Sequence, residues 1–280
     1  MSGSLNYLPS LVSTLSGTSD ALLNAIYGQG RAIQTGQSAV VALANAQHNE
    51  TSEIAATAKQ PSVKRAIADF TKAVQSATSV KQLLANPSVM NVLLTANGMS
   101  DQIGYTALAK AALTSNVNDA NSLVNKLTDT RWKTLASTYN FATSGLSGIQ
   151  RPKAIAAIAK AYAQTVWEQA EDKATPGLAN ALTFIAQASS ARSVDAILGN
   201  PTLRTVVTTT LGIPKQIAFQ TLGAQEKSIS SRFDVTKLQD PKFVQSFAQR
   251  YLIANAQNQS SASSITDITT LAAQAGGIVV

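Results

Sequence analysis

Apolar residues recur at helical intervals along most of the chain. Within the stretch 61–76, the apolar positions Val63, Ile67, Phe70 and Val74 are separated by four, three and four residues. This spacing places them on one face of a helix. The stretch 153–173 carries Ile155, Ile158, Ala159, Tyr162 and Val166 in a similar register. We predict an amphipathic helix in each stretch, and we expect the second one to form a central rod.

Thirty residues of this pattern occur twice, at a constant offset of 114. Residues 79–108 read SVKQLLANPSVMNVLLTANGMSDQIGYTAL, and residues 193–222 read SVDAILGNPTLRTVVTTTLGIPKQIAFQTL. Both copies hold an Asn-Pro pair and, eleven or twelve residues later, a glycine. Proline suits the first turn of a helix, and glycine suits the left-handed position that ends one. Each copy is therefore predicted to fold as helix, Asn-Pro turn, helix and glycine stop.

The two copies keep their apolar spacing and exchange their charges. Val92 corresponds to Val206, whereas Lys81 corresponds to Asp195. A catalytic motif would keep its polar residues, so this repeat indicates a building unit. Beyond it, LTDTRW (127–132) aligns with LQDPKF (238–243), each with an aspartate placed to cap a helix. The predicted fold is all-α, a multi-helix domain with an internal pseudo-two-fold helical repeat.

Three segments are expected. Residues 1–58 form a polar, weakly helical N-terminal segment, residues 59–256 a helical body with repeats at about 63–142 and 178–256, and residues 257–280 a flexible tail. Short helices with little charge are marginal alone and gain stability when a neighbour buries their apolar face. The predicted protein-interaction residues are the apolar positions of the two ends: Leu5, Leu8, Leu11, Val12, Leu15, Ile265, Ile268, Leu271 and Ile278.

Composition favours an assembly or exported protein over a charge-rich soluble enzyme. The 280 residues include 46 Ala and 94 Ser, Thr, Asn or Gln, and only 13% are charged. The net charge of +7 comes from the middle of the chain, where basic residues are scattered singly, which argues against nucleic-acid binding. No apolar stretch is long enough to span a membrane, and the first 30 residues lack the basic and apolar regions of a cleaved signal peptide.

Residues suited to catalysis or metal binding are sparse. The single histidine, His48, could share a metal with Glu50 and Glu53, but these positions converge poorly on a helix. The acidic trio Glu168, Glu171 and Asp172 could hold a hard cation, although a solvated helix face is the simpler interpretation. No cysteine and no phosphate-binding glycine loop occur. We predict no enzymatic activity, no catalytic or metal residue and no cofactor.

Several motifs, in order, resemble those of the bacterial domain of unknown function numbered twelve-seventeen. They include NPSVMNVLLTANGM, NSLVNKLTDTRWKTLASTYNFA, AYAQTVWEQAEDKATPGLANALTFIAQ and RFDVTKLQDPKFVQSFAQRYL, and together they cover roughly residues 61–254. The resemblance implies an all-α fold without an assigned activity, and genes that often lie among flagellar genes. The chain departs from the family in its long polar first segment and its low charge.

Together these features predict a non-catalytic structural or assembly protein of the bacterial flagellum or a related exported surface structure. It would act by protein–protein packing, through self-assembly or with flagellar components, and would leave the cell without a cleaved signal peptide. The alternatives are a small-molecule hydrolase with an unrecognised site and a cytoplasmic accessory or binding protein.

Overall fold

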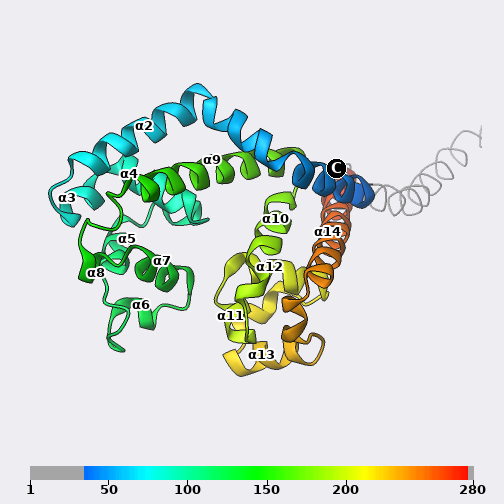
Figure 1. Ribbon diagram of the computed structural model, residues 1–280. Coiled ribbons are helices and arrows are strands. Elements are labelled where there is room, and N and C mark those ends of the chain that lie inside the picture. Colours follow the sequence, from blue (N-terminus) through cyan, green and yellow to red (C-terminus); the bar gives the residue numbers. More distant parts are fainter. Residues whose placement is uncertain (1–34, 277–280) are drawn as a thin grey trace, which may run out of the picture.

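The computed structural model describes the backbone of residues 35–276 and the side chains of residues 35–261. Within this range the chain is all-α and contains no strand. Its helices form two lobes, one built mainly from α2 to α8 and the other from α10 to α14, and α9 runs across both (Figure 1). The predicted fold class is confirmed at this level.

A long helix over residues 35–59 leads into α2. Pro61 occupies the first turn of α2, and the backbone of Gln60 before it is extended (φ −59°, ψ 138°). A residue that precedes proline is disfavoured in the helical region, so the chain bends at this point. Ala39, Leu43, Ala46 and Ile54 of the 35–59 helix are buried in the second lobe. The segment that the sequence suggested to be weakly helical is thus helical from residue 35 and packed against the body.

The first lobe encloses one hydrophobic cluster. Its elements are α2 (Pro61–Ser76), α3 (Val80–Ala85), α4 (Pro87–Ala96), η1 (Ser100–Gln102), α5 (Thr106–Leu113), α6 (Leu123–Lys126), α7 (Arg131–Tyr139) and α8 (Phe141–Ser144). The cluster includes Phe70 and Val74 of the predicted helix face, together with Trp132, Leu135 and Ala136 of α7, all of them buried. Tyr139 stacks on Phe141 with ring centroids 5.7 Å apart.

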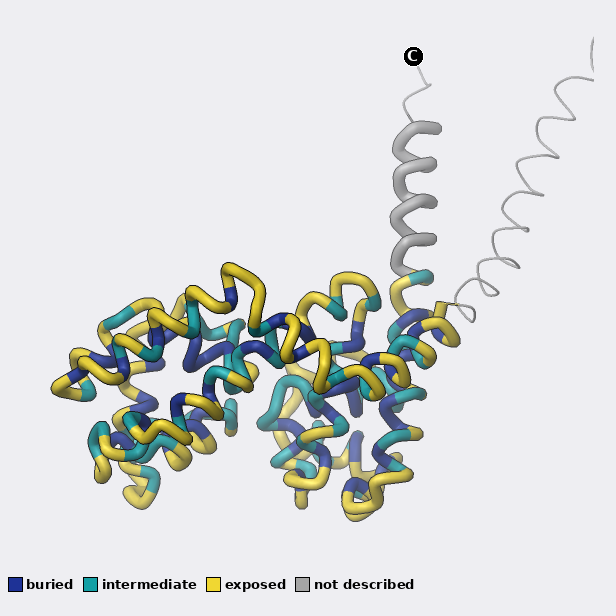
Figure 2. The backbone as a smooth tube through the Cα atoms, turned by 45° about the horizontal axis from the view of Figure 1, so that its top comes forward, coloured by how far each residue is buried: buried dark blue, intermediate teal, exposed yellow. Residues whose placement is uncertain are grey.

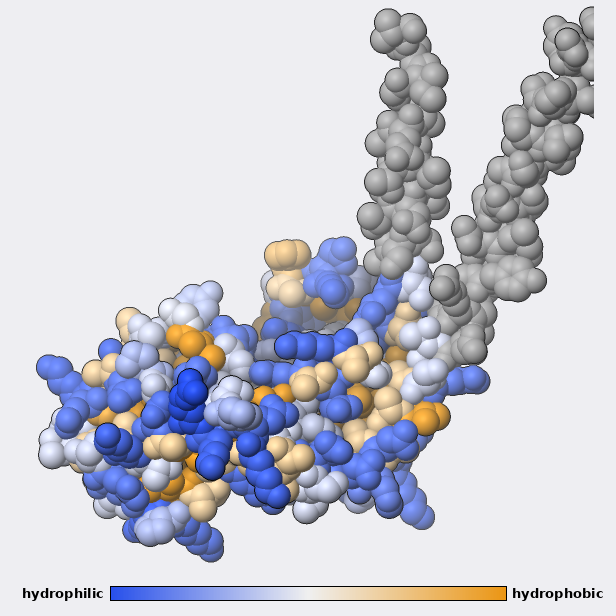
Figure 3. Space-filling model, turned by 90° about the horizontal axis from the view of Figure 1, so that it is seen from above, coloured by the Kyte–Doolittle hydropathy of each residue, from blue (hydrophilic) through white to orange (hydrophobic). Residues whose placement is uncertain are grey.

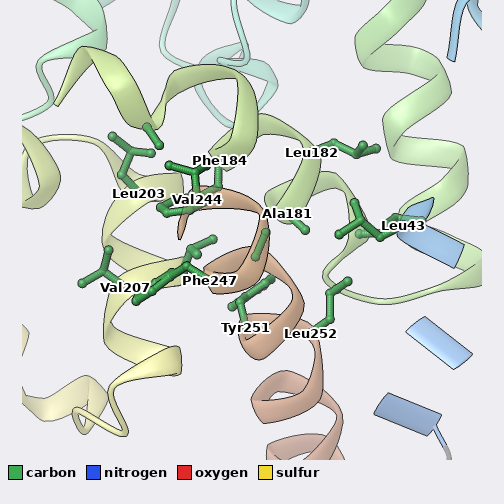
Figure 4. Close-up of a cluster of buried hydrophobic side chains, with 14 of the residues drawn as sticks. Leu43, Ala181, Leu182, Phe184, Leu203, Val207, Val244, Phe247, Tyr251 and Leu252 are labelled. Carbon is green, nitrogen blue, oxygen red and sulfur yellow. The ribbon is translucent and has the colours of Figure 1, made fainter. Parts of the chain in front are cut away.

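The second lobe encloses another cluster. It contains α10 (Leu178–Gln187), η2 (Ala188–Ser190), α11 (Val194–Leu198), α12 (Pro201–Thr210), η3 (Lys215–Phe219), α13 (Leu222–Ser230), η4 (Val235–Gln239) and α14 (Pro241–Gly276). Figure 4 shows Phe184, Phe247 and Tyr251 inside this cluster, with Leu43 reaching it from the 35–59 helix. The strand-prone run VVTTT is helical in α12, as predicted. Helix α14 passes through the predicted segment boundary at residue 257 without interruption.

Helix α9 (Pro152–Ala174) contributes to both clusters. Ile155 and Ile158 are buried in the first cluster, and Ala163 and Trp167 are buried in the second. Tyr162, between these pairs, packs against both clusters. In Figure 2, buried residues, in dark blue, occur in both lobes. The predicted central rod is present.

The two doubled stretches have the same local caps. Asn86 Oδ1 accepts from the backbone N–H groups of Ser88 and Val89, and Asn200 Oδ1 accepts from those of Thr202 and Leu203. Each following helix ends at a glycine with positive φ, 67° at Gly98 and 62° at Gly212. A left-handed backbone of this kind suits glycine because it lacks Cβ. Both glycines thus stop their helices in the predicted way.

The asparagine caps should stabilise the two lobes by similar amounts. An N-cap side chain satisfies backbone donors that the helix itself leaves unpaired, so Asn86→Ala and Asn200→Ala should each lower the free energy of unfolding by about 1 kcal/mol. Urea unfolding followed by circular dichroism measures this. Asn45→Ala, at an exposed position inside the 35–59 helix, is the control and should cost nothing. Equal stability of all three variants would contradict the role of the caps.

Candidate functional site: a groove between the lobes

A cavity of about 750 Å³ lies between the two lobes. One wall comes from α4, η1 and α7 of the first lobe, and the other comes from α10, η2 and α12 of the second. Helix α9 lines the space between these walls through Ala161, Gln164, Thr165, Glu168 and Gln169. Most polar groups in the lining are amides and hydroxyls, and none of the lining residues is aromatic. The cavity therefore offers hydrogen bonds and small apolar contacts.

A second cavity of about 280 Å³ continues the first along α9. The two share Ala96, Asn97 and Ala161 as lining residues. The second is mainly apolar, and Tyr139 is its aromatic residue. Asn97 Nδ2 donates to the Tyr139 hydroxyl at 2.9 Å, while burial raises the pKa of this tyrosine. We call the two cavities together the α9 groove.

Arg131 braces one wall of the α9 groove. Its Nη2 lies 2.7 Å from Asp129 Oδ2 and 2.8 Å from Asp101 Oδ2, and its Nη1 donates to the Gly98 carbonyl oxygen at 2.7 Å. The guanidinium therefore ties the end of α4 and η1 to the start of α7. Its planar fork suits this geometry, because it can serve two carboxylates and a carbonyl at once.

Arg131 lies between two carboxylates, and each ion shifts the pKa of the other. Burial alone would lower the pKa of Arg131, but hydrogen bonds and charge from Asp129 and Asp101 raise it. Burial alone would raise the pKa of Asp101, but hydrogen bonds from Arg131 and Gln102, with the charge of Arg131, bring it below its ordinary value. The wall thus presents a bound cation within a cluster whose net charge is negative.

Glu168 is the other ionisable group of the α9 groove. Only 9% of this residue is exposed. Gln164 Nε2 donates to its Oε1 at 2.9 Å, and the Thr183 hydroxyl donates to its Oε2 at 3.4 Å. Burial raises the pKa of Glu168 and nearby Glu50 adds to the rise, whereas the two hydrogen bonds oppose it. This carboxyl is therefore easier to protonate than an exposed glutamate.

A direct backbone contact joins the lobes beside the groove. The Thr130 backbone N–H donates to the Gly199 carbonyl oxygen at 2.9 Å, and the Thr130 hydroxyl donates to the same oxygen at 3.1 Å. A Cβ atom at Gly199 would lie 2.5 Å from Thr130 Cγ2. Glycine is required here because any side chain would push the lobes apart.

The residues that the sequence proposed for catalysis or metal binding do not come together. His48 and Glu53 are exposed on the 35–59 helix and do not line the α9 groove. In the acidic trio, Asp172 Oδ1 accepts from the backbone N–H groups of Gly177 and Ala179 at the start of α10, while Glu168 is bound as described above. In the described part of the chain no group of three or more metal-binding side chains converges.

The predicted interaction residues lie at or beyond the ends of the described range. Leu5, Leu8, Leu11, Val12, Leu15 and Ile278 are outside the described residues. Ile265, Ile268 and Leu271 belong to α14, whose side chains are described only as far as residue 261. The α9 groove itself was not predicted. One local motif of the sequence, the Asp-x-Arg of LTDTRW, contributes to it. From the sequence, the aspartate of this motif was predicted only to cap a helix.

A known protein family matches the middle of the chain. The family described as "Protein of unknown function (DUF1217)" matches residues 96–244, which is more than half of the chain. The chain belongs to this family. The match confirms the resemblance noted from the sequence motifs, and DUF1217 carries no activity in its description. The matched range contains all of α7 and α9 and the Thr130–Gly199 contact.

A solved structure has the same fold. The X-ray crystal structure of protein AGR_C_984 from Agrobacterium tumefaciens is similar with a TM-score of 0.68 and 24% sequence identity, over 80% of this chain and 94% of that one. At this identity the likeness shows the fold alone. No curated protein matches the chain. No helix in the described part of the chain has both the length and the apolar character needed to cross a bilayer.

Removing the Arg131 brace should destabilise the first lobe. Arg131→Ala leaves two carboxylates without their cation, so we expect a loss of about 3 kcal/mol of unfolding free energy. Arg131→Lys should lose less, since a lysine keeps the charge but cannot serve both carboxylates in the same plane. Chemical denaturation measures both. Lys133→Ala, an exposed cation on the same helix, is the control, and an equal loss there would contradict the brace.

Replacing Glu168 should change how stability depends on pH. A carboxyl with a raised pKa in the folded state binds its proton more tightly there, so stability falls as pH rises from about 4, its ordinary pKa, to the raised value. Glu168→Gln keeps the shape and cannot ionise. It should melt at a higher temperature than the wild type at pH 7, and the gap should close below about pH 4. Thermal melts across this range test it, with Glu53→Gln as the exposed control.

Proposed function

We propose that this DUF1217 protein is a non-catalytic assembly protein of the bacterial flagellum or a related exported surface structure, and that it acts through packing of its two chain ends. One observation carries the proposal: the start of the described chain packs against α14 near Ile253, and α14 continues from there to Gly276. A pair of adjacent, weakly charged segments suits contacts with neighbouring subunits better than it suits a solvent-exposed surface.

The packing of the 35–59 helix on α14 brings the ends together. A Cβ atom at Gly36 would lie 3.1 Å from Ile253 Cα, so glycine permits a very close approach there. Further along, Gln47 and Gln245 exchange side-chain hydrogen bonds of 3.0 and 2.9 Å. The numbers rise on one helix as they fall on the other, so the helices are antiparallel. Figure 1 shows the start of the 35–59 helix beside the upper part of α14.

Repetition of one helical unit would explain the rest of the body. We infer that the lobes are two copies of that unit, related by a pseudo-two-fold arrangement. The matched caps at Asn86 and Asn200 and the matched glycine stops support this, as do Phe70 and Phe184, which are both fully buried. In this proposal the repeat provides a stable body, and the ends make the contacts.

The surface supports packing over charge-driven binding. On the face seen in Figure 3, hydrophobic side chains lie scattered among polar ones and do not form one large patch. Residues 1–19 contain no charged side chain, and residues 257–280 contain only Asp267. The alternative of an accessory or binding protein is favoured by the α9 groove, whereas the hydrolase alternative would depend on His48, which lies outside the groove.

Shearing filaments from cells and fractionating them tests the proposal. We expect the wild-type protein to be recovered with filaments or basal bodies, and Ile268→Asp to be lost from that fraction, because a charge at an apolar position opposes burial. Thr269→Asp, at the adjacent polar position, is the matched control and should remain. Normal filaments and motility after deletion of the gene would contradict the proposal.

A further inference from the structure

The α9 groove has the length and lining of a helix-binding site. Its α9 side is formed by Ala154, Ala157, Ile158, Ala161, Gln164, Thr165, Glu168 and Gln169, which share one face of the helix. From the first to the last of these the helix rises about 22 Å. Alanines along this face keep the groove open and allow another backbone to approach. Helix-in-groove recognition uses such a surface, with side chains of the incoming helix seated at intervals of three and four residues.

The electrostatics of the groove disfavour an acidic occupant. Its cation, Arg131, is bound by Asp101 and Asp129, and its buried carboxyl, Glu168, is held by two side-chain donors. One guanidinium between two carboxylates leaves a net negative charge, and the Asp101 side chain is 53% exposed. An acidic side chain that entered would lose its hydration and meet this charge, which costs free energy. The groove therefore fits a segment that is apolar on the face it presents and carries small polar residues elsewhere.

The end of α14 is a segment of this kind. Among the side chains of α14 that the structure describes, up to residue 261, Ala256 is the last buried one, and the helix continues to Gly276. These 20 residues rise about 30 Å, and a helix of that length is only marginally stable in water without a surface to pack on. In the sequence, Ile265, Ile268 and Leu271 recur at intervals of three, and Asp267 is the one charge. Its length and composition match the groove.

The α14 end of the same molecule cannot reach its own groove. Helix α14 continues past the point where Ile253 meets Gly36, at the end of the body. The groove, in contrast, opens between the lobes along α9. Folding back would require a break in α14, and residues 242–275 contain neither proline nor glycine to make one. An α14 end that fills the groove must therefore come from another molecule.

We propose that the α9 groove of one molecule binds the α14 end, residues 257–276, of a second copy. The contact joins two different surfaces, so each molecule keeps one free groove and one free helix end, and the copies add head to tail into an open chain. This inference rests on the proposed assembly function and deepens it, because it names the partner and the site.

The absence of cysteine allows a direct test by cross-linking. Full-length Ala157→Cys protein is mixed with full-length Ile268→Cys protein and treated with a short bismaleimide. Ala157 is exposed and lines the groove, whereas the neighbouring Ala156 is exposed and does not line it. We expect a mixed dimer with Ala157→Cys, and a yield about tenfold lower with Ala156→Cys. Equal yields, or a dominant dimer of Ile268→Cys with itself, would overturn the inference.

Self-association supplies a second readout. Ala157→Trp fills the groove and should weaken self-association in sedimentation velocity about tenfold, or about 1.4 kcal/mol, since overfilling a packed contact is unfavourable. Ala156→Trp should leave it unchanged. No concentration-dependent association of the wild type up to millimolar protein also overturns the inference. If Ile268→Asp leaves the filament fraction while the groove does not cross-link, the assembly function stands and the groove site fails. If the groove cross-links but the wild-type protein is not recovered with filaments, the groove site stands and the assembly function fails.

Discussion

One helix, α9, must complete two hydrophobic cores at once, and the arrangement of the lobes depends on this. Its first half buries Ile155 and Ile158 in one cluster, and its second half buries Trp167 in the other, with Tyr162 touching both. Helix α2 also contributes to both clusters, since Val63 lies in the second cluster and Phe70 in the first. Two rigid helices that each satisfy both cores hold the lobes at a fixed separation. The remaining α9 surface then lines the space between them, and this is why a groove exists.

Local chemistry of the sequence was sufficient to predict several helix boundaries in the body. Asn-Pro pairs begin α4 and α12, and Gly98 and Gly212 follow their ends, because these residues favour their positions through hydrogen bonds and backbone geometry that need no tertiary context. Such signals lie within a few residues of one another. They report local structure reliably and say little about which helices meet.

The 35–59 helix and the α9 groove were missed for two different reasons. In the helix, Ala39, Leu43 and Ala46 do recur at helical intervals, but alanine is a weak apolar signal among so many Ser, Asn and Gln residues. The groove brings together positions more than 60 residues apart, such as Thr130 and Gly199, and no local pattern encodes that contact. Gly199 is an example, because the residue that leaves no room for a Cβ atom there, Thr130, lies in the opposite lobe.

The distribution of charge connects the body with its ends. Inside the groove, Arg131 is bound by two carboxylates and Glu168 by two side-chain donors, so the one cation of the groove is not available to a partner. The ends carry almost no charge. Contacts between such surfaces depend on shape and apolar burial, which salt screens little. In the proposed assembly, neighbours would be recognised by fit, and the rigidity that α9 and α2 impose on the two lobes would make that fit specific.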